Sequence, residues 1–257
     1  FTISDSLLTV GETATVDLVF SEAVFGFASA ADIADPSGTL AAMTSSDNIT
    51  WTGTFTPTAN TEEASNTLSL ATSWTDLAGN AGPSETTPNY EVETKAPTGS
   101  FTFTDYHFKL GDNATVTLVF SEVVVGFSSD DDIMVPNLDN GTTSGTLAAM
   151  ISNDNKTWAG IFTPTANTEN ASTTLSLDTS YTDTAGNTGI AGTSSSYVVD
   201  TKGPSVSSLQ LSDGVTTIST FTDRCIPVTS NIMVTFSEAM ETSYITTSTS
   251  DTNCAGS

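Results

Sequence analysis

The sequence contains very few basic residues. Its 257 residues include 5 Lys and Arg against 30 Asp and Glu, which gives a formal net charge of -25. A nucleic-acid-binding protein needs a basic face to neutralise phosphates, and an anionic membrane repels so acidic a chain. The composition therefore predicts that neither is a partner. Clustered carboxylates repel one another, so divalent cations, or a solvated surface suited to salt, would be needed to keep the chain compact.

Cysteine, histidine and long apolar runs are also scarce. The two cysteines, Cys225 and Cys254, are too few for a disulfide scaffold, and each could pair with the other or with a residue beyond Ser257. The sole histidine, His107, is better interpreted as a surface residue than as a base. No run of 18 apolar residues occurs, so no bilayer-spanning helix is expected. Without a nucleophile paired with a base, or a phosphate-binding glycine loop, we expect no enzyme.

A long internal repeat organises what is present. The segment at 51–61 returns as 158–168, which is 107 residues later. Earlier in the repeat, Val-Phe-Ser-Glu at 19–22 returns at 119–122, only 100 residues later. The second copy therefore contains an insertion, and its Pro, Asn and Gly residues at 134–144 predict a surface loop.

The joints between the copies also repeat. Residues 90–97 return almost unchanged as 197–204, and in both an alternating run ends in an acidic residue, a Thr-Lys pair and a Pro. Proline cannot donate to a sheet, so a strand ends there. The joints predict a first module at 1–96, a second at 97–203 and a partial third at 204–257. Because the chain starts without Met and stops within a module, we expect it to be a piece of a longer repeat array.

Within each module, apolar residues alternate over short runs between turn clusters, which is the period of β-strands. About seven strands in roughly a hundred residues predict an all-β fold of tandem immunoglobulin-like Greek-key β-sandwiches. The expected strands of the first module span 1–4, 13–20, 23–28, 38–44, 49–56, 66–73 and 88–94. Recurring Trp51 and Trp158 are expected in or near the core, and Asp5, Asp105 and Asp213 are expected to cap the turn after the first strand.

These motifs resemble a known family. Val-Phe-Ser-Glu at 19–22 and 119–122, Thr-Asp-x-Ala-Gly-Asn at 75–80 and 182–187, and the Thr-Lys-x-Pro joints resemble the bacterial immunoglobulin-like repeats of large surface proteins and adhesins. Residues 235–249 are similar to a related immunoglobulin-like family of surface-layer and envelope proteins. The resemblance implies an extracellular, cell-surface location and calcium-stiffened linkers between modules.

The acidic motifs are expected to gather where modules meet. If strands run alternately between two poles, the loops after the second and sixth strands share the pole reached by the preceding module. Calcium favours six to eight oxygen ligands, so we hypothesise Ca²⁺ at these joints. The candidate ligands are Glu22, Asp76 and Asn80 in the first module, Glu93 at its end, Glu122, Asp183 and Asn187 in the second module, and Asp200 with Glu238 at the next joint.

A turn explains part of the same pattern. Asp-x-Ala-Gly-Asn suits a loop in which Asp and Asn bond to the backbone and Gly takes a positive φ, and for Asp and Asn alone the two interpretations are level. The recurrence of Glu22, Glu122 and Glu238 after a hydrophobic strand favours the metal.

The functional prediction is a non-enzymatic segment that extends and stiffens a surface stalk or fibre. Its expected partners are neighbouring modules of the same chain. Two alternatives stay open. One is a filament subunit that assembles with copies of itself through strand complementation, and the other is an adhesive or carbohydrate-binding module that uses the insertion at 134–144.

Overall fold

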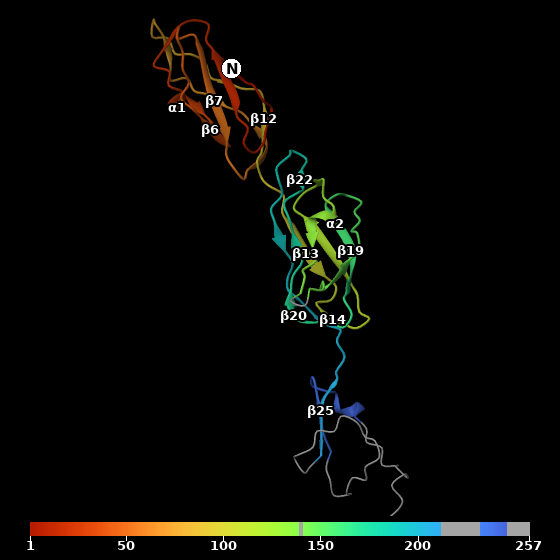
Figure 1. The fold of residues 1–257 in the computed structure, drawn as a ribbon. Helices are drawn as coiled ribbons and strands as arrows, with labels where there is room; N and C mark the ends of the chain where they lie inside the picture. Colours follow the sequence, from red (N-terminus) through yellow and green to blue (C-terminus); the bar gives the residue numbers. More distant parts are fainter. Residues whose placement is uncertain (139–140, 212–231, 246–257) are drawn as a thin grey trace, which may run out of the picture.

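The computed structural model describes residues 1–138, 141–211 and 232–245. Cys225, Cys254 and Asp213 lie outside these residues, so their pairing and capping roles stay predictions. The described residues form mainly strands, with two four-residue helices and one short 3₁₀ turn, and the predicted all-β fold is confirmed. In Figure 1, modules 1 and 2 (residues 1–96 and 97–203) lie end to end, with β22 at the end of module 2 that faces module 1. Within the described part of the chain, no helix has the length and apolar character of a membrane span.

Module 1 places its strands in two layers. Its elements are β1 (Thr2–Ile3), β2 (Leu7–Leu8), β3 (Ala14–Val19), β4 (Val24–Phe25), α1 (Ser29–Asp32), β5 (Ile33–Ala34), β6 (Gly38–Leu40), β7 (Thr50–Pro57), β8 (Glu62–Asn66), β9 (Ser69–Leu70), β10 (Thr75–Asp76), β11 (Glu85–Thr86) and β12 (Tyr90–Glu93). One sheet has the order β1-β3-β7-β6, and the other includes β2-β12-β8. The first strand is split, because β1 pairs with β3 whereas β2 runs parallel to β12 in the opposite sheet.

Module 2 repeats this plan. Its elements are β13 (Gly99–Phe103), β14 (His107–Lys109), β15 (Ala114–Phe120), β16 (Val124–Val125), α2 (Ser129–Asp132), β17 (Ile133–Met134), β18 (Gly145–Leu147), β19 (Thr157–Pro164), β20 (Glu169–Thr173), β21 (Ser176–Leu177), β22 (Thr182–Asp183), β23 (Gly192–Thr193) and β24 (Tyr197–Asp200). The sheet orders β13-β15-β19-β18 and β14-β24-β20 match those of module 1. In the third segment (residues 204–257), β25 (Val206–Leu211) pairs with β26 (Ile232–Phe236), and η1 spans Thr242–Tyr244.

Each module has its own hydrophobic core, as the period-2 pattern predicts. On β3, for example, Ala14, Val16 and Leu18 are buried while the intervening residues are exposed. Trp51 and Trp158 are partly buried and pack edge-on against Phe27 and Phe127, which confirms their near-core position.

Every expected strand of module 1 has a counterpart, but the boundaries differ in instructive ways. The expected strand at 66–73 is shorter, because Asn66 ends β8 and only Ser69–Leu70 forms β9. Strand β8 escaped prediction because four of its five residues are exposed and it has no apolar alternation. The expected strand at 23–28 ends at Phe25, because the next residue, Gly26, takes φ of +73°. Strands β2, β5, β10 and β11 have two residues each, too few to show a period.

The predicted turn caps are present where the structure describes them. Asp5 Oδ1 accepts a hydrogen bond from the backbone N–H of Leu7 at 3.1 Å, and Asp105 Oδ1 accepts one from His107 at 2.9 Å. Both contacts close a short turn after the first strand of each module, which directs the chain from one sheet to the other. The expected capping roles of Asp5 and Asp105 are therefore confirmed.

Candidate functional site

The side chain of Asn187 joins the two modules. Its Oδ1 accepts a hydrogen bond from the backbone N–H of Val10 at 3.1 Å, and its Nδ2 donates to the carbonyl of Glu93 at 3.0 Å. Val10 lies in the turn between β2 and β3, and Glu93 is the last residue of β12. Asn187 is only 3% exposed. One buried amide therefore binds two separate segments at the end of module 1.

A rigid loop in module 2 holds this amide in place. Asp183 ends β22, and its two carboxylate oxygens accept from the backbone N–H and the Nδ2 of Asn187 at 2.8 and 2.7 Å. Gly186 takes φ of +90°, which a side chain would disfavour. Asp183 is itself 1% exposed. The loop thus presents its Asn side chain toward module 1 with every polar atom of the amide bonded.

The chain between the modules is bound on both sides. After the joint, the carbonyl of Pro97 accepts from the N–H of Ile190 at 3.0 Å, and the Tyr181 hydroxyl lies 3.3 Å from the same carbonyl. Thr98 and Ser121 exchange two bonds, because Thr98 N–H donates to Ser121 Oγ and Ser121 N–H donates to Thr98 O. Module 2 therefore binds the incoming chain from Pro97 onward, and the free linker is very short.

The recurring Thr-Lys pair of the joint closes the end of its own module. The Thr94 hydroxyl, in a residue 5% exposed, donates to the carbonyl of Thr58 at 2.7 Å and accepts from the N–H of Thr61 at 2.9 Å. Lys95 Nζ lies 3.1 Å from a carboxylate oxygen of Glu62. The same contacts recur one module later, where Thr201 takes the place of Thr94 and Lys202 pairs with Glu169. The motif thus has an intramodular role that the sequence did not indicate.

Carboxylates gather around the joint. Burial raises the pKa of Glu93 and that of Glu122 above the ordinary value, and repulsion from Asp183 and from Glu62 raises both further. The Glu93 carboxylate also raises the pKa of Glu122, so these two glutamates repel each other. The Glu62 carboxylate, followed by Glu122 and Glu93, raises the pKa of the Lys95 ammonium. The joint is therefore an acidic cluster, and the Lys95 ammonium is the positive charge that lowers the pKa of both glutamates.

The residues expected to bind calcium at this joint are close together, but two of them are engaged. Asp183 accepts both bonds from Asn187, and Asn187 Oδ1 accepts from Val10. Glu93 Oε1 accepts from the backbone N–H of Lys95 at 3.0 Å. Glu93 Oε2 and the Glu122 carboxylate are therefore the more available oxygen ligands. Across residues 1–138, 141–211 and 232–245, no three His, Cys, Asp or Glu side chains are grouped in a way that could hold a metal ion. Calcium at the joint stays a prediction.

The remaining predicted ligands lie elsewhere. Glu22 and Asn80 are exposed and Asp76 is half-buried at the end of module 1 that faces away from module 2. Asp200 ends β24 and Glu238 follows β26, and both are exposed. No hydrogen bond joins Asp200 and Glu238 in the part of the chain that the structure describes, and their role at a metal also stays a prediction.

Sequence reasoning missed several residues of the joint. The backbone N–H of Val10 carries no side-chain signal, although the exposed turn recurs as Leu110 and Gly111. Ser121 belongs to the repeated Val-Phe-Ser-Glu motif, in which the sequence points only to the carboxylate of Glu122. Tyr181 replaces Trp74 of module 1, and this difference between the repeats was the available clue to its contact with the joint.

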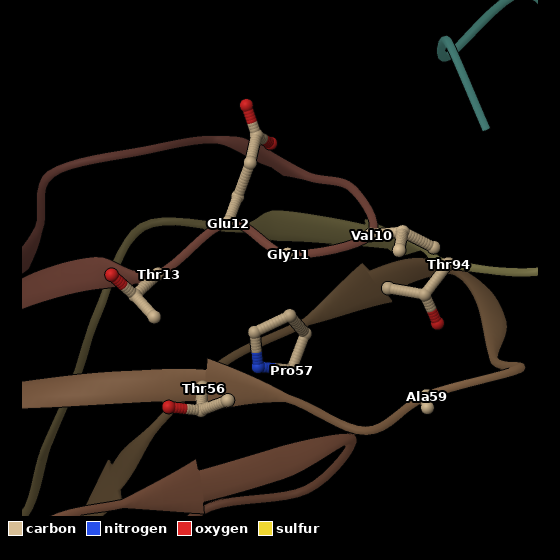
Figure 2. A pocket seen from close by; sticks show the side chains of 8 residues that line it. All are labelled: Val10, Gly11, Glu12, Thr13, Thr56, Pro57, Ala59 and Thr94. Atoms are coloured by element: carbon tan, nitrogen blue, oxygen red, sulfur yellow. The ribbon is translucent and has the colours of Figure 1, made fainter. Parts of the chain in front are cut away.

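A small pocket lies beside the joint on module 1. Figure 2 shows it between the turn at Val10 and Gly11, the end of β7 at Pro57, and Thr94. Its volume is about 130 Å³. Sites for small organic ligands are usually at least about 300 Å³, so this hollow is too small for one. It belongs to the packing of the module end.

The family comparison agrees with the repeats and the fold. A family model described as "Bacterial Ig-like domain" matches residues 1–92 and again residues 93–199. The chain belongs to this family. These two bacterial Ig-like domains contain the two hydrophobic cores and meet at the joint described above. A search of curated proteins found no match to the chain. The likeness of residues 235–249 to surface-layer proteins stays a prediction.

Three solved structures are similar to the chain. The Escherichia coli adhesin FdeC is 15% identical with a TM-score of 0.32, and the match covers 82% of this chain and 65% of the adhesin chain. The I9-I11 tandem of titin is 10% identical with a TM-score of 0.34, covering 81% and 67% of the two chains. Murine CEACAM1b is 12% identical with a TM-score of 0.27, covering 78% and 98%. These scores are too low to support any inference about function.

Proposed function

We propose that this chain is a non-enzymatic spacer of a surface-exposed bacterial repeat protein, in which bacterial Ig-like domains are held in line by a docked joint. The observation that carries the proposal is the buried Asn187 amide, which bonds to Val10 and to Glu93 across the joint. A flexible tether would need no such bridge. Because the amide binds two segments at once, it resists both bending and twisting between modules 1 and 2.

The membership of the family and the composition support the surface location. The chain is rich in Ser, Thr and Asn, poor in Lys and strongly acidic, which suits an exposed and well-solvated protein. Protease treatment of intact cells that make the native protein tests this part. Cleavage of the protein while a cytoplasmic marker survives supports a surface location, and full protection contradicts it.

The joint itself is tested by Asn187→Ala. Residual dipolar couplings measured by NMR report whether the two modules share one orientation in solution. Modules that move as one unit fit a single alignment tensor, and we expect Asn187→Ala to require two. The lost bonds leave the N–H of Val10 and the carbonyl of Glu93 without a protein partner.

The chain provides a matched control in Asn80→Ala. Asn80 makes the same two bonds to Asp76 within its loop, but no bond to another module within the described residues. In the wild type and in Asn80→Ala, we expect a single alignment tensor to fit both modules. Two independent tensors in the wild type would contradict the docked joint, and so would an unchanged single tensor in Asn187→Ala.

Calcium at the joint is a second part of the proposal, and the acidic cluster supports it. Glu93 and Glu122 are partly buried and repel each other and Asp183. A bound cation would offset this repulsion, and calcium accepts carboxylate and carbonyl oxygens in irregular arrangements. Glu93 and Glu122 are the residues that would hold it, and calcium would supply a crosslink between the carboxylates of neighbouring modules.

Calorimetric titration of the whole chain with Ca²⁺, in parallel with the Glu93→Gln/Glu122→Gln variant, tests this role. We expect binding that the double variant weakens at least about tenfold. Glu85→Gln, on the exposed strand β11 of module 1, is the control for the overall negative charge. Absence of binding, or equal weakening by both changes, would contradict calcium at the joint.

Strand complementation in a filament is a candidate that one further observation favours. The apolar side chains of Val206, Ile232 and Met233, on the paired strands β25 and β26, are more than half exposed. A strand donated by a second copy would cover such side chains. Electron microscopy of the purified chain at rising concentration tests this. Ordered polymers support the filament, and particles no longer than a single molecule at every concentration contradict it.

A further inference from the structure

The far end of module 1 carries an exposed copy of the loop that forms the joint. Asp76 and Asn80 correspond to Asp183 and Asn187 of module 2. The bonds within the two loops agree closely, because Asp76 accepts from Asn80 N–H at 2.8 Å and from its Nδ2 at 2.7 Å, as Asp183 does from Asn187. Gly79 takes φ of +87° against +90° for Gly186. The amide of Asn80 is therefore already oriented without a partner.

The two loops differ in what their amides contact. In module 2, Asn187 Oδ1 accepts from Val10 and its Nδ2 donates to Glu93. Over the described residues, Asn80 Oδ1 has no hydrogen bond and Nδ2 bonds only to Asp76. Asn187 is buried, whereas Asn80 is exposed. The same donor and acceptor that bind module 1 at the joint are thus open to solvent at the far end of module 1.

A second, independent feature of this end points to the same partner. Ser121 and Thr98 exchange two backbone and side-chain bonds, and Ser237 and Ser205 exchange the same pair in the third segment. In both cases the Ser of the Ser-Glu motif binds the chain that arrives from the preceding module. The equivalent Ser21 is exposed and, in the described part of the chain, has neither bond.

We propose that the surface formed by Ser21, Asp76 and Asn80 is a docking site for the C-terminal end of another module of the same type, held in tandem ahead of Phe1. The occupant would present an N–H from its turn, as Val10 does, and a carbonyl from the end of its last strand, as Glu93 does. Its connecting chain would pair with Ser21. This inference rests on the proposed docking of the joint by Asn187.

Two substitutions make this site weaker than the joint between modules 1 and 2. Pro83 stands where module 2 has Ile190, so the N–H that binds the carbonyl of Pro97 has no counterpart. Trp74 stands in place of Tyr181, and its indole N–H donates to Ala71 within module 1. The docking site therefore keeps the Asn and Ser contacts and lacks those two.

The experiment adds a module to the full chain. Unlabelled residues 1–100 are ligated ahead of Phe1 of the ¹⁵N-labelled chain, which preserves the native spacing of the joint. NMR then measures how fast the side-chain amide protons of Asn80 exchange with water, with the signals assigned by their loss in Asn80→Ala. We expect exchange to slow by roughly tenfold on addition of the module, as for one hydrogen bond gained.

Two comparisons make the result decisive. Val10→Pro in the added copy removes the donor N–H, and we expect it to reverse part of the protection. Asn187 in the same sample reports the joint between modules 1 and 2. Protected Asn187 with unchanged exchange at Asn80 overturns this inference alone. Rapid exchange at Asn187 in the native chain overturns the proposed joint, and with it the premise of the inference.

Discussion

The loops at residues 76–80 and 183–187 have nearly the same backbone and the same Asp–Asn pair, yet they occupy opposite environments. Asp183 and Asn187 are 1% and 3% exposed, because module 1 covers them, while Asn80 is exposed. The internal bonds are equal in length within about a tenth of an ångström. The loop is therefore stable as a turn, and its side chain becomes an intermodular contact only when a neighbour is docked.

This comparison bears on the turn, one of the two interpretations that the sequence left level. The turn interpretation is correct for both loops, because Asp bonds to the backbone of Asn and Gly takes a positive φ in each. The convergence of Asp183, Asn187, Glu93 and Glu122 at one joint is also present. Asn187 is thus a turn residue and a joint residue at once.

The largest difference between the loops is expected from Asn→Asp changes. Asn187→Asp would place a carboxylate against Asp183 and the carbonyl of Glu93, both of which now accept from its Nδ2. A buried, unpaired charge costs about 3–5 kcal/mol. Urea unfolding at pH 7 measures the loss. Asn80→Asp, at the exposed loop, should lose much less, and equal losses would show that the effect lies in the turn rather than in the joint.

The next effect should be alike in both modules. Thr94→Val and Thr201→Val keep the shape of the side chain but remove a buried hydroxyl that donates to one carbonyl and accepts from one N–H. Each change should lower the free energy of unfolding by about 1–3 kcal/mol, because buried polar groups lose their partners. Two unfolding transitions, followed separately by NMR signals of each module, test this. A loss of stability in only one module would contradict the same role for the threonine hydroxyl in both.

A smaller loss of stability is expected in module 2 alone. Tyr181→Phe removes the hydroxyl that donates to the carbonyl of Ile190 at 2.8 Å and lies near that of Pro97, at the start of module 2. We expect a loss of about 0.5–1.5 kcal/mol in the stability of module 2. Amide hydrogen exchange at Thr98 and Ile190 should speed up. Unchanged exchange at both positions would show that the hydroxyl does not hold the incoming chain.

The smallest effect is the dependence of the joint on pH. Because the pKa values of Glu93 and Glu122 are raised in the folded protein, chiefly by burial, protonation favours the docked state. Their stabilising contribution is fully present below the ordinary pKa of Glu, about 4.5, and is lost as pH rises through the raised values. The melting temperature of the chain without added metal should therefore fall as pH rises above about 4.5. Glu93→Gln/Glu122→Gln should flatten this trend, and an unchanged slope would contradict it.

Much of the architecture could be predicted from the sequence, because strand alternation and the internal repeat are both visible in it. The alternation on Ala14–Val19 buries one face of β3, and the repeat of 107 residues places Trp51 and Trp158 in equivalent packing. The polar strand β8 and the two-residue strands could not be found, because their positions are set by backbone pairing rather than by an apolar pattern. The helices α1 and α2 are single turns, too short for a helical period.

For the site, the sequence indicated which acidic and amide residues recur but not what they contact. It placed Glu93, Glu122, Asp183 and Asn187 at one joint, since alternating strands bring their loops to the same pole. It did not show that Asn187 bonds to the backbone of Val10, because a backbone N–H has no signature in the sequence. It also assigned no partner to Lys95, which pairs with Glu62 in its own module.

The sequence by itself determined the all-β fold, the tandem copies and the turn made by Asp183 and Asn187, because these depend on local periodicity and on contacts within a few residues. Only the tertiary structure decided that one of two matching loops is covered. The approach of Val10 and Glu93 to Asn187 depends on how two separately folded modules meet. That contact joins residues far apart in the chain, where no local pattern of side chains specifies the geometry.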